Sequence, residues 1–146
     1  MNFSRSATID WQGGIMDGGG QLAAGTGAFT LPVSFPRRIG NPEGGTSPEE
    51  LIAGAHATCY AMVVAGALGR AGATTRKTHV GCTITAEKTD AGIKILSSKL
   101  SVVAEGLSGM DAAKFDAMAK EAEGKCPVSN ALRGSLTITV ETSVRN

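Results

Sequence analysis

Aromatic side chains are scarce in this chain of 146 residues, which holds four Phe, one Trp and one Tyr. A hydrophobic core must therefore be built mainly from small and branched aliphatic residues. Net charge is also nearly absent, because 14 Lys and Arg offset 13 Asp and Glu to give +1. A chain so balanced lacks the one-signed charge that attracts nucleic acids or anionic membranes, so we expect neither partner.

A secretory signal is missing as well, since residues 1–7 contain no apolar run. The uncharged stretch 51–69 is long enough to raise the question of a membrane span. It consists mostly of Ala and Gly and includes His56 and Thr58, which favours a buried helix of a soluble protein. We expect a cytoplasmic protein that forms a single domain over 1–146, with no membrane segment.

Spacings typical of metal or phosphate sites are absent too. The cysteines Cys59, Cys82 and Cys126 lie far apart, and the chain has no Cys-x-x-Cys or His-x-x-x-His pattern. The glycine groups near residues 13 and 18 do not separate a strand from a helix, so they do not indicate a phosphate-binding loop. We expect no metal and no cofactor, and free thiols in the reducing cytosol.

The patterns that are present come in blocks of strands and blocks of helices, which indicates an α+β fold with a mostly antiparallel sheet. The glycine groups near 13 and 18 are interpreted as turns and residues 37–45 as a loop. Alternating apolar residues predict strands over 7–11, 28–35 and 136–140, and a hairpin over 80–102 that turns at 89–92. Helical periodicity and caps predict helices over 47–70 and 111–123, and a short helix that opens at Cys126.

The helix predicted over 47–70 begins with strong signals. Ser47 is the N-cap, Pro48 suits the first helical position, and Glu50 completes a capping box. Almost every later side chain is apolar or small, so we expect this helix to be buried nearly all round. A central helix wrapped by a sheet, or packed against a partner's copy, fits that composition.

The three thiols differ in their expected surroundings. Cys82 lies on the apolar face of a predicted strand and is interpreted as core filler. Cys126 precedes a short helix, whose N–H groups and dipole favour a thiolate, and Lys125 adds positive charge. Cys59 lies inside the long helix, where apolar surroundings raise the pKa of a thiol, so its reactivity requires a cation from elsewhere in the fold.

Two arginines can supply that cation, because Arg37 and Arg38 precede the long helix. Glu49 can orient one of them, since the other glutamate of the first turn serves the cap. His56 lies one turn before Cys59, and a Cys–His pair at this spacing is conceivable. A lone histidine on a helix is more often structural.

Two segments resemble the OsmC/Ohr family of hydroperoxide reductases. Residues 45–62 contain Gly-Thr-Ser-Pro-Glu-Glu-Leu-Ile and Ala-His-Ala-Thr-Cys-Tyr-Ala-Met, which resemble the family's long helix. Residues 126–132, Cys-Pro-Val-Ser-Asn-Ala-Leu, resemble its second cysteine motif. The strand pattern agrees along essentially the whole chain. His56 and the Cys-Pro-Val-Ser form resemble the OsmC branch most closely.

The resemblance implies an OsmC-like α+β fold, with a sheet around a central helix, in an intertwined homodimer whose active sites lie at the subunit interface. It implies a peroxidase for organic hydroperoxides, with hydrogen peroxide as a further substrate. Cys59 would attack the peroxide and Cys126 would resolve the product as a disulfide. A dithiol such as dihydrolipoamide or a lipoylated protein would reduce it. Glu49 carries over directly as the glutamate that holds the thiolate site, and Arg38 is preferred to Arg37 as the arginine.

Two other classes of protein stay open at this point. One is a non-catalytic dimer that binds an apolar ligand in its groove, with the cysteines as filler. The other is a Cys–His acyl-transfer enzyme that uses Cys59 and His56. A hydroperoxide pulse separates them, because only the peroxidase loses two thiols together.

Overall fold

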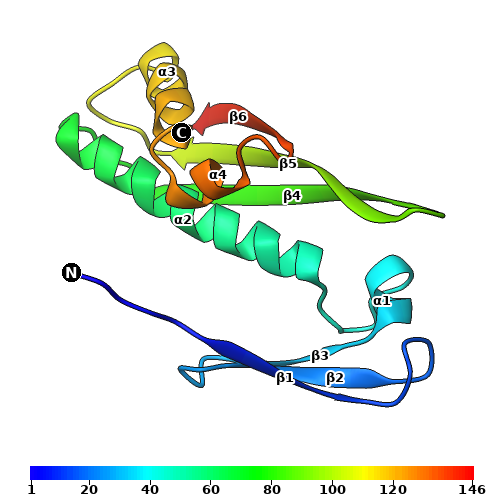
Figure 1. The fold of residues 1–146 in the computed structure, drawn as a ribbon. Coiled ribbons are helices and arrows are strands. Elements are labelled where there is room, and N and C mark those ends of the chain that lie inside the picture. The colour runs from blue at the N-terminus through cyan, green and yellow to red at the C-terminus, as the bar shows by residue number, and fades with distance from the viewer. The chain divides into compact units, whose positions relative to one another are not determined.

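The computed structural model describes residues 1–146, which form two compact units, 1–51 and 52–146 (Figure 1). The α+β class is confirmed, with two three-stranded sheets and one long helix. The first unit contains β1 (Ala7–Gln12), β2 (Gly19–Ala24), β3 (Thr30–Val33) and α1 (Phe35–Ile39). The long helix α2 (Pro48–Arg70) follows, and then β4 (Lys77–Thr89), β5 (Gly92–Glu105), α3 (Ala112–Glu123), α4 (Pro127–Leu132) and β6 (Thr137–Arg145).

The first sheet is antiparallel in the order β1-β2-β3 and contains a strand that the sequence analysis missed. Gly19 and Gly20 were interpreted as turn residues, but they begin β2. Gly20 pairs with Trp11, and a Cβ at Gly20 would come within 2.9 Å of a backbone oxygen of β1. Glycine at this position lets the backbones of β1 and β2 approach closely. The sequence alone indicated a turn, because glycine is also common in turns. The turn itself ends at Gly18, whose N–H bonds to the Gly14 carbonyl oxygen at 2.8 Å.

Residues 35–39 form the short helix α1, so the prediction of a strand to residue 35 followed by a loop is wrong there. Pro36 lies in the first turn of this helix, where its missing N–H costs nothing. The Arg38 N–H donates to the Ser34 carbonyl oxygen at 3.0 Å. Proline therefore opens a helix here instead of merely closing a strand, and Arg37 and Arg38 both lie on α1.

The start of α2 follows the predicted cap. The Ser47 hydroxyl accepts the Glu50 N–H at 3.2 Å. The Glu50 carboxylate accepts the Thr46 hydroxyl at 2.8 Å, so the expected return bond of a capping box is replaced by a contact one residue earlier.

The burial of α2 differs from the prediction. Only one stripe, His56, Tyr60, Val64 and Leu68, is buried in the chain. Residues four apart share one helical face, and this face packs against the second unit's core. Met62, by contrast, is 70% exposed. The expectation of a helix buried nearly all round is therefore wrong for a single chain, because residues beside the stripe, such as Cys59 and Val63, are covered only in part by the core.

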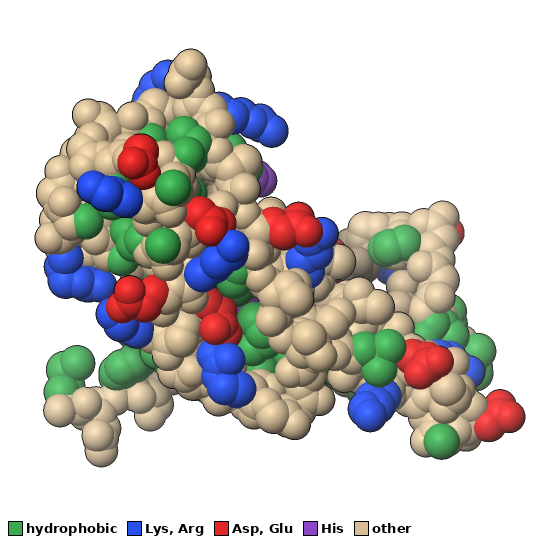
Figure 2. All heavy atoms as spheres, turned by 90° about the horizontal axis from the view of Figure 1, so that it is seen from above, with side chains coloured by type: hydrophobic (Ala, Val, Ile, Leu, Met, Phe, Trp, Pro, Cys, Tyr) green, Lys and Arg blue, Asp and Glu red, His purple; other side chains and the backbone are tan.

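By length and composition α2 could also span a membrane. Its packed stripe contains a buried histidine bonded at both ring nitrogens, as befits the core helix of a globular unit. On the face drawn in Figure 2, Lys and Arg side chains lie beside Asp and Glu side chains instead of gathering by sign.

The second sheet has the order β4-β5-β6. The predicted hairpin is confirmed, since β4 and β5 pair antiparallel and turn at Asp90 and Ala91 before Gly92, whose φ is +121°. The last strand runs parallel to β5, because α3 and α4 intervene and return the chain to the same end of the sheet. The architecture is thus mostly antiparallel, but divided into two sheets, one of them mixed.

The hydrophobic core lies wholly in the second unit. Its largest members, Tyr60, Phe115 and Leu100, come from α2, α3 and β5 and are fully buried. The helix predicted over 111–123 is present as α3, and Asp111 caps it by accepting the Lys114 N–H at 2.8 Å. Two of the few aromatic rings thus lie at the point where both helices meet the sheet.

Candidate active site

Two thiols meet where α2 passes the start of α4. Cys126 is the N-cap of α4, and its sulfur accepts the Ser129 N–H at 3.5 Å. Cys59 packs against the core cluster that includes Cys126. Its thiol interacts with the Cys126 side chain and with the Val128 backbone. Both cysteines are free thiols, and they lie close enough for the Cys126 side chain to raise the pKa of the Cys59 thiol.

The two thiols differ in exposure. Cys126 is fully buried, whereas Cys59 is half-buried. A reactant arriving from solvent therefore reaches the Cys59 thiol before the Cys126 thiol.

Burial raises the pKa of the Cys59 thiol, and the neighbouring Cys126 thiol raises it further. A backbone interaction with Val128 opposes these effects. Within the second unit, none of the groups that shift this pKa is a cation. The unit alone thus leaves Cys59 mostly protonated at neutral pH, in line with the expectation that its activation requires a cation.

The positive charge expected beside Cys126 is already paired. The Lys125 ammonium donates to the Glu121 carboxylate at 2.8 Å, one turn back on α3. The cap geometry predicted for Cys126 is therefore present, but the extra charge is directed toward solvent.

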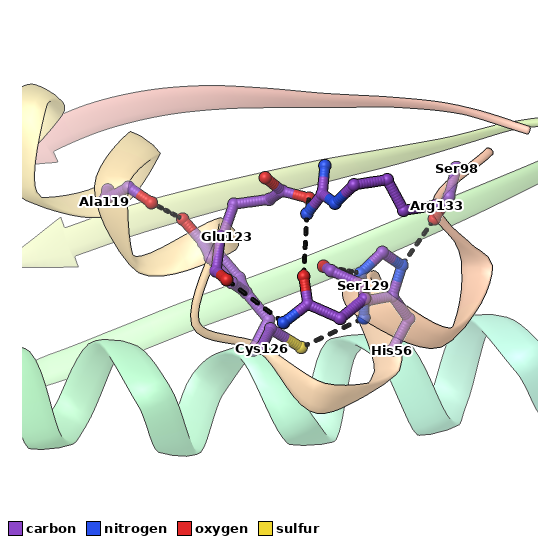
Figure 3. A network of polar contacts seen from close by, with 10 residues as sticks. His56, Ser98, Ala119, Glu123, Cys126, Ser129 and Arg133 are labelled. Carbon is purple, nitrogen blue, oxygen red and sulfur yellow. Dashed lines mark hydrogen bonds and ion pairs between the residues drawn. The ribbon is translucent and has the colours of Figure 1, made fainter.

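Polar contacts hold the outer side of α4 in place (Figure 3). The Asn130 side chain donates to the Gly124 carbonyl oxygen at 3.1 Å. The Arg133 guanidinium donates to Glu123 at 2.7 Å and to Asn130 at 3.2 Å. A helix of only six residues is thereby tied to the end of α3.

His56 holds the inner side of the same helix. Its Nδ1 lies 2.7 Å from the Ser98 hydroxyl and its Nε2 lies 2.6 Å from the Ser129 hydroxyl. Burial lowers the pKa of His56, which favours the neutral ring. Both ring nitrogens are occupied, so His56 does not serve as a base for Cys59. The Cys–His acyl-transfer alternative thus lacks its base.

The polar cluster of His56, Ser98 and Ser129 was not predicted from the sequence, and Cys82 borders it. Its sulfur lies 3.2 Å from the Ser98 hydroxyl and 3.9 Å from His56 Nδ1, and burial raises the pKa of its thiol. One signal was available in the sequence, because Ser98 shares a strand face with Leu100 and Val102, where an apolar residue is usual.

Arg38 and Glu49 form a tight pair in the first unit. Arg38 Nη2 donates to Glu49 Oε1 at 2.6 Å, and Arg38 Nε lies 3.1 Å from both carboxylate oxygens. The bond holds the pKa of Glu49 below its ordinary value and that of Arg38 above it. Arg37 instead lies 3.8 Å from the exposed Glu43. Of the two candidate arginines, Arg38 is therefore the one that Glu49 orients.

No group of three or more His, Cys, Asp or Glu side chains is arranged to hold a metal ion. A shallow hollow of about 470 Å³ lies between α2 and β4, lined by Ala57, Thr58, Ala61, Met62, Thr78, His79 and Val80.

Comparison with known proteins gives one consistent family. The OsmC-like protein family matches residues 40–141. The chain is 34% identical over 140 residues to peroxiredoxin OsmC of Escherichia coli (strain K12), covering 94% of this chain and 96% of that protein. It is 30% identical over 125 residues to the organic hydroperoxide resistance protein of Xanthomonas axonopodis pv. citri (strain 306), covering 83% and 84%. A solved organic hydroperoxide resistance protein OsmC from Legionella pneumophila superposes with a TM-score of 0.74 at 23% identity, over 99% of this chain and 98% of that one.

Proposed function

Since the chain belongs to the OsmC-like protein family, we propose that it is a thiol peroxidase that reduces organic hydroperoxides to alcohols. The observation that carries this proposal is the proximity of a half-buried Cys59 thiol to a fully buried Cys126 thiol in one packed cluster. The names of the two sequence relatives, a peroxiredoxin and an organic hydroperoxide resistance protein, support a role in removing peroxides.

The first step is attack by the Cys59 thiolate on the distal peroxide oxygen. The O–O bond breaks, the alcohol leaves after taking up a proton, and Cys59 becomes a sulfenic acid. The exposure of Cys59 relative to Cys126 supports this order. In this order Cys126, whose position at the helix cap favours a thiolate, is the nucleophile of the second step. Cys59, which needs a cation because of its apolar surroundings, is the nucleophile of the first step.

In the second step the Cys126 sulfur attacks the Cys59 sulfenic sulfur. An S–S bond forms, the S–O bond breaks, and the hydroxide leaves as water with the Cys126 proton. The N–H of Ser129 at the Cys126 sulfur supports this step, because it stabilises negative charge on the attacking atom.

A dithiol then regenerates the enzyme by two exchange reactions and is itself oxidised to a disulfide. We assign this role to dihydrolipoamide or a lipoylated protein, following the family resemblance. The more exposed Cys59 sulfur is the one that an external dithiol reaches first.

Activation of Cys59 requires a cation, and we assign it to Arg38 held by Glu49. Their pairing supports the assignment, since an arginine fixed by a carboxylate presents its remaining N–H groups in one direction. A nearby guanidinium lowers the pKa of a thiol and so increases the thiolate fraction at neutral pH.

The active form is an intertwined homodimer with the site at the subunit interface. The apolar surface left exposed by one chain supports this assembly, notably Met62 at 70% on α2 and Ile9 at 49% on β1. Apolar surface of this kind, spread over two elements, is typical of obligate interfaces. In our proposal the chain acts as one functional domain over 1–146 in the cytoplasm.

Organic hydroperoxides suit the surroundings of Cys59 better than hydrogen peroxide. Ala55, Met62 and Val63 neighbour it on the surface of α2. An alkyl tail gains about 0.8 kcal/mol for each CH₂ that such side chains bury. Hydrogen peroxide is therefore a slower, secondary substrate.

A thiol count before and after a hydroperoxide pulse tests the proposal. The reduced protein is mixed with one equivalent of tert-butyl hydroperoxide, and the remaining thiols are alkylated and located by mass spectrometry. Cys59 and Cys126 should disappear together as one disulfide, while Cys82 stays reduced. A protein that retains all three thiols would contradict the peroxidase proposal and favour the non-catalytic alternative.

A further inference from the structure

A buried line of polar groups joins three elements of the second unit around His56 (Figure 3). It begins at Ser98 on β5, passes through the imidazole on α2, and ends at the Ser129 hydroxyl on α4. His56, Ser98 and Ser129 each have 0% exposure. No buried side-chain polar atom of the chain lacks a partner, so the line is fully satisfied.

The bond to Ser129 has a local consequence for the thiols. Ser129 uses its hydroxyl for His56 and its backbone N–H for the Cys126 sulfur. The same residue therefore connects the imidazole to the cap of α4. Fixing its side chain against α2 also fixes the turn that carries Cys126.

Apolar packing alone does not explain this arrangement. Burying an imidazole and two hydroxyls costs free energy unless all of them are paired, and an apolar trio would fill the space without that cost. In exchange, the hydrogen bonds fix the position of α4, because a hydrogen bond of 2.6 Å is directional and a van der Waals contact is not.

We infer that His56 is a positioning residue for the resolving step: through Ser129 it holds the first turn of α4 so that the Cys126 sulfur faces Cys59. The inference rests on the proposed function, because it concerns the reaction of Cys126 with the Cys59 sulfenic acid. The first step needs only a diffusing peroxide at Cys59, and a displaced α4 acts on it only by weakening the interaction of the Val128 backbone with the Cys59 thiol. The second step joins two sulfurs on different elements, so it depends more strongly on the position of α4.

The test measures the two steps separately in a single turnover. Reduced protein is mixed with one equivalent of tert-butyl hydroperoxide, and peroxide consumption reports the attack. Alkylation at timed intervals reports disulfide formation, and a dimedone adduct reports sulfenic acid that is still waiting.

Ser129→Ala removes the hydroxyl and keeps the backbone N–H at the Cys126 sulfur. We expect peroxide consumption close to that of the wild type and disulfide formation slower by about tenfold, the factor that corresponds to about 1.4 kcal/mol. The dimedone adduct should accumulate to match.

Two substitutions of the histidine form a matched pair. An amide can donate and accept, and the longer glutamine places it near the position of Nε2, whereas asparagine places it near that of Nδ1. His56→Gln should therefore keep the bond to Ser129 and resolve faster than His56→Asn. This rescue does not depend on Ser129→Ala being well folded.

Tyr60→Phe is the control for general loosening. It removes another fully buried side-chain bond of α2, from the Tyr60 hydroxyl to the Ala119 carbonyl oxygen at 2.7 Å, which ends on α3. We expect lower thermal stability and an unchanged ratio of the two rates.

Resolution in Ser129→Ala at the wild-type rate would overturn the inference, as would equal slowing in Tyr60→Phe or in both histidine variants. These outcomes are distinct from failure of the proposed function, in which the wild type itself would form no Cys59–Cys126 disulfide.

Discussion

Residues 52–146 and residues 1–51 differ most in what they bury. All eleven hydrophobic residues of the buried core belong to the longer segment. In the shorter one only Thr46 is buried, and all six residues of β1 are exposed. Backbone pairing without a core rarely stabilises a three-stranded sheet. In the proposed homodimer, a second chain would supply the apolar contacts that the first segment lacks.

The residues to which our proposal assigns chemical roles divide in the same way. Cys59 and Cys126 belong to the segment with its own core, whereas Arg38 and Glu49 belong to the segment without one. A thiol pair requires fixed geometry, which a packed core provides. If the cation that activates it comes from the assembly-dependent segment, reactivity is coupled to correct association.

The largest expected effect is loss of activity when a proposed reactive thiol of residues 52–146 is removed. Cys59→Ser should abolish peroxide consumption, because no other thiol is both accessible and in contact with a resolving thiol. Cys126→Ser should consume one equivalent and stop, with Cys59 open to further oxidation. Cys82→Ser should remain nearly fully active, and a folded but inactive Cys82→Ser would refute the disulfide assignment.

The next effect tests the core itself. Phe115→Ala should lower the free energy of unfolding by about 3–5 kcal/mol, because it empties a fully buried site. Ile9→Ala, at a residue 49% exposed in the chain, should cost under about 1 kcal/mol unless a partner covers it. Urea unfolding of both variants over a range of protein concentrations makes the measurement. A large cost for Ile9→Ala in dilute, monomeric protein would erase the contrast between the segments.

Association should appear directly in thermal unfolding. If a second copy covers the exposed apolar surface, the melting temperature should rise with protein concentration. Light scattering should give about twice the 14.8 kDa of one chain. A mass of one chain at micromolar concentration, with a melt that does not depend on concentration, would contradict the dimer and the interfacial site.

A smaller effect is expected on the rate of peroxide attack when Arg38, in residues 1–51, is removed. Arg38→Ala should slow peroxide attack at neutral pH by about tenfold, since one pKa unit corresponds to about 1.4 kcal/mol. Removing the cation leaves the pKa of Cys59 raised by burial, so the rate should recover as the pH rises through that pKa.

Arg37→Ala is the matched control for Arg38→Ala, because Arg37 makes its one ion pair with the exposed Glu43 at 3.8 Å and none with Glu49. Its attack rate should stay near that of the wild type across the pH range. A larger loss in Arg37→Ala would reverse the assignment of the activating arginine.

The smallest expected effect is on the free energy of unfolding, through the Arg38–Glu49 ion pair in residues 1–51. The pKa of Glu49 is lowered in the folded chain by Arg38, so its stabilisation is present above the unfolded value of about 4.3 and is lost as the pH falls through the folded value. Glu49→Gln should therefore be less stable than the wild type at neutral pH and nearly equal to it in acid. A difference that persists unchanged at pH 3 would show that the charge is not responsible.

Much of the fold could be predicted from short stretches of sequence. Ser47, Asp111 and Cys126 mark helix starts because a cap depends on atoms within three residues of it. The hairpin turn before Gly92 follows from equally local backbone preferences. The strand β2 and the helix α1 were not predicted, because glycine and proline each occur in several kinds of structure. Only their neighbours in space show which kind is present.

The amino-acid sequence by itself determined the helices α2, α3 and α4, the hairpin, and the two cysteine motifs that resemble the OsmC/Ohr family. Only the tertiary structure decided that α2 buries a single stripe, that β6 runs parallel to β5, and that Glu49 selects Arg38. It alone revealed His56 between Ser98 and Ser129, residues 42 and 73 positions away along the chain. Caps and turns depend on neighbours in sequence, whereas burial, strand order and side-chain partners depend on which distant segments share the remaining space.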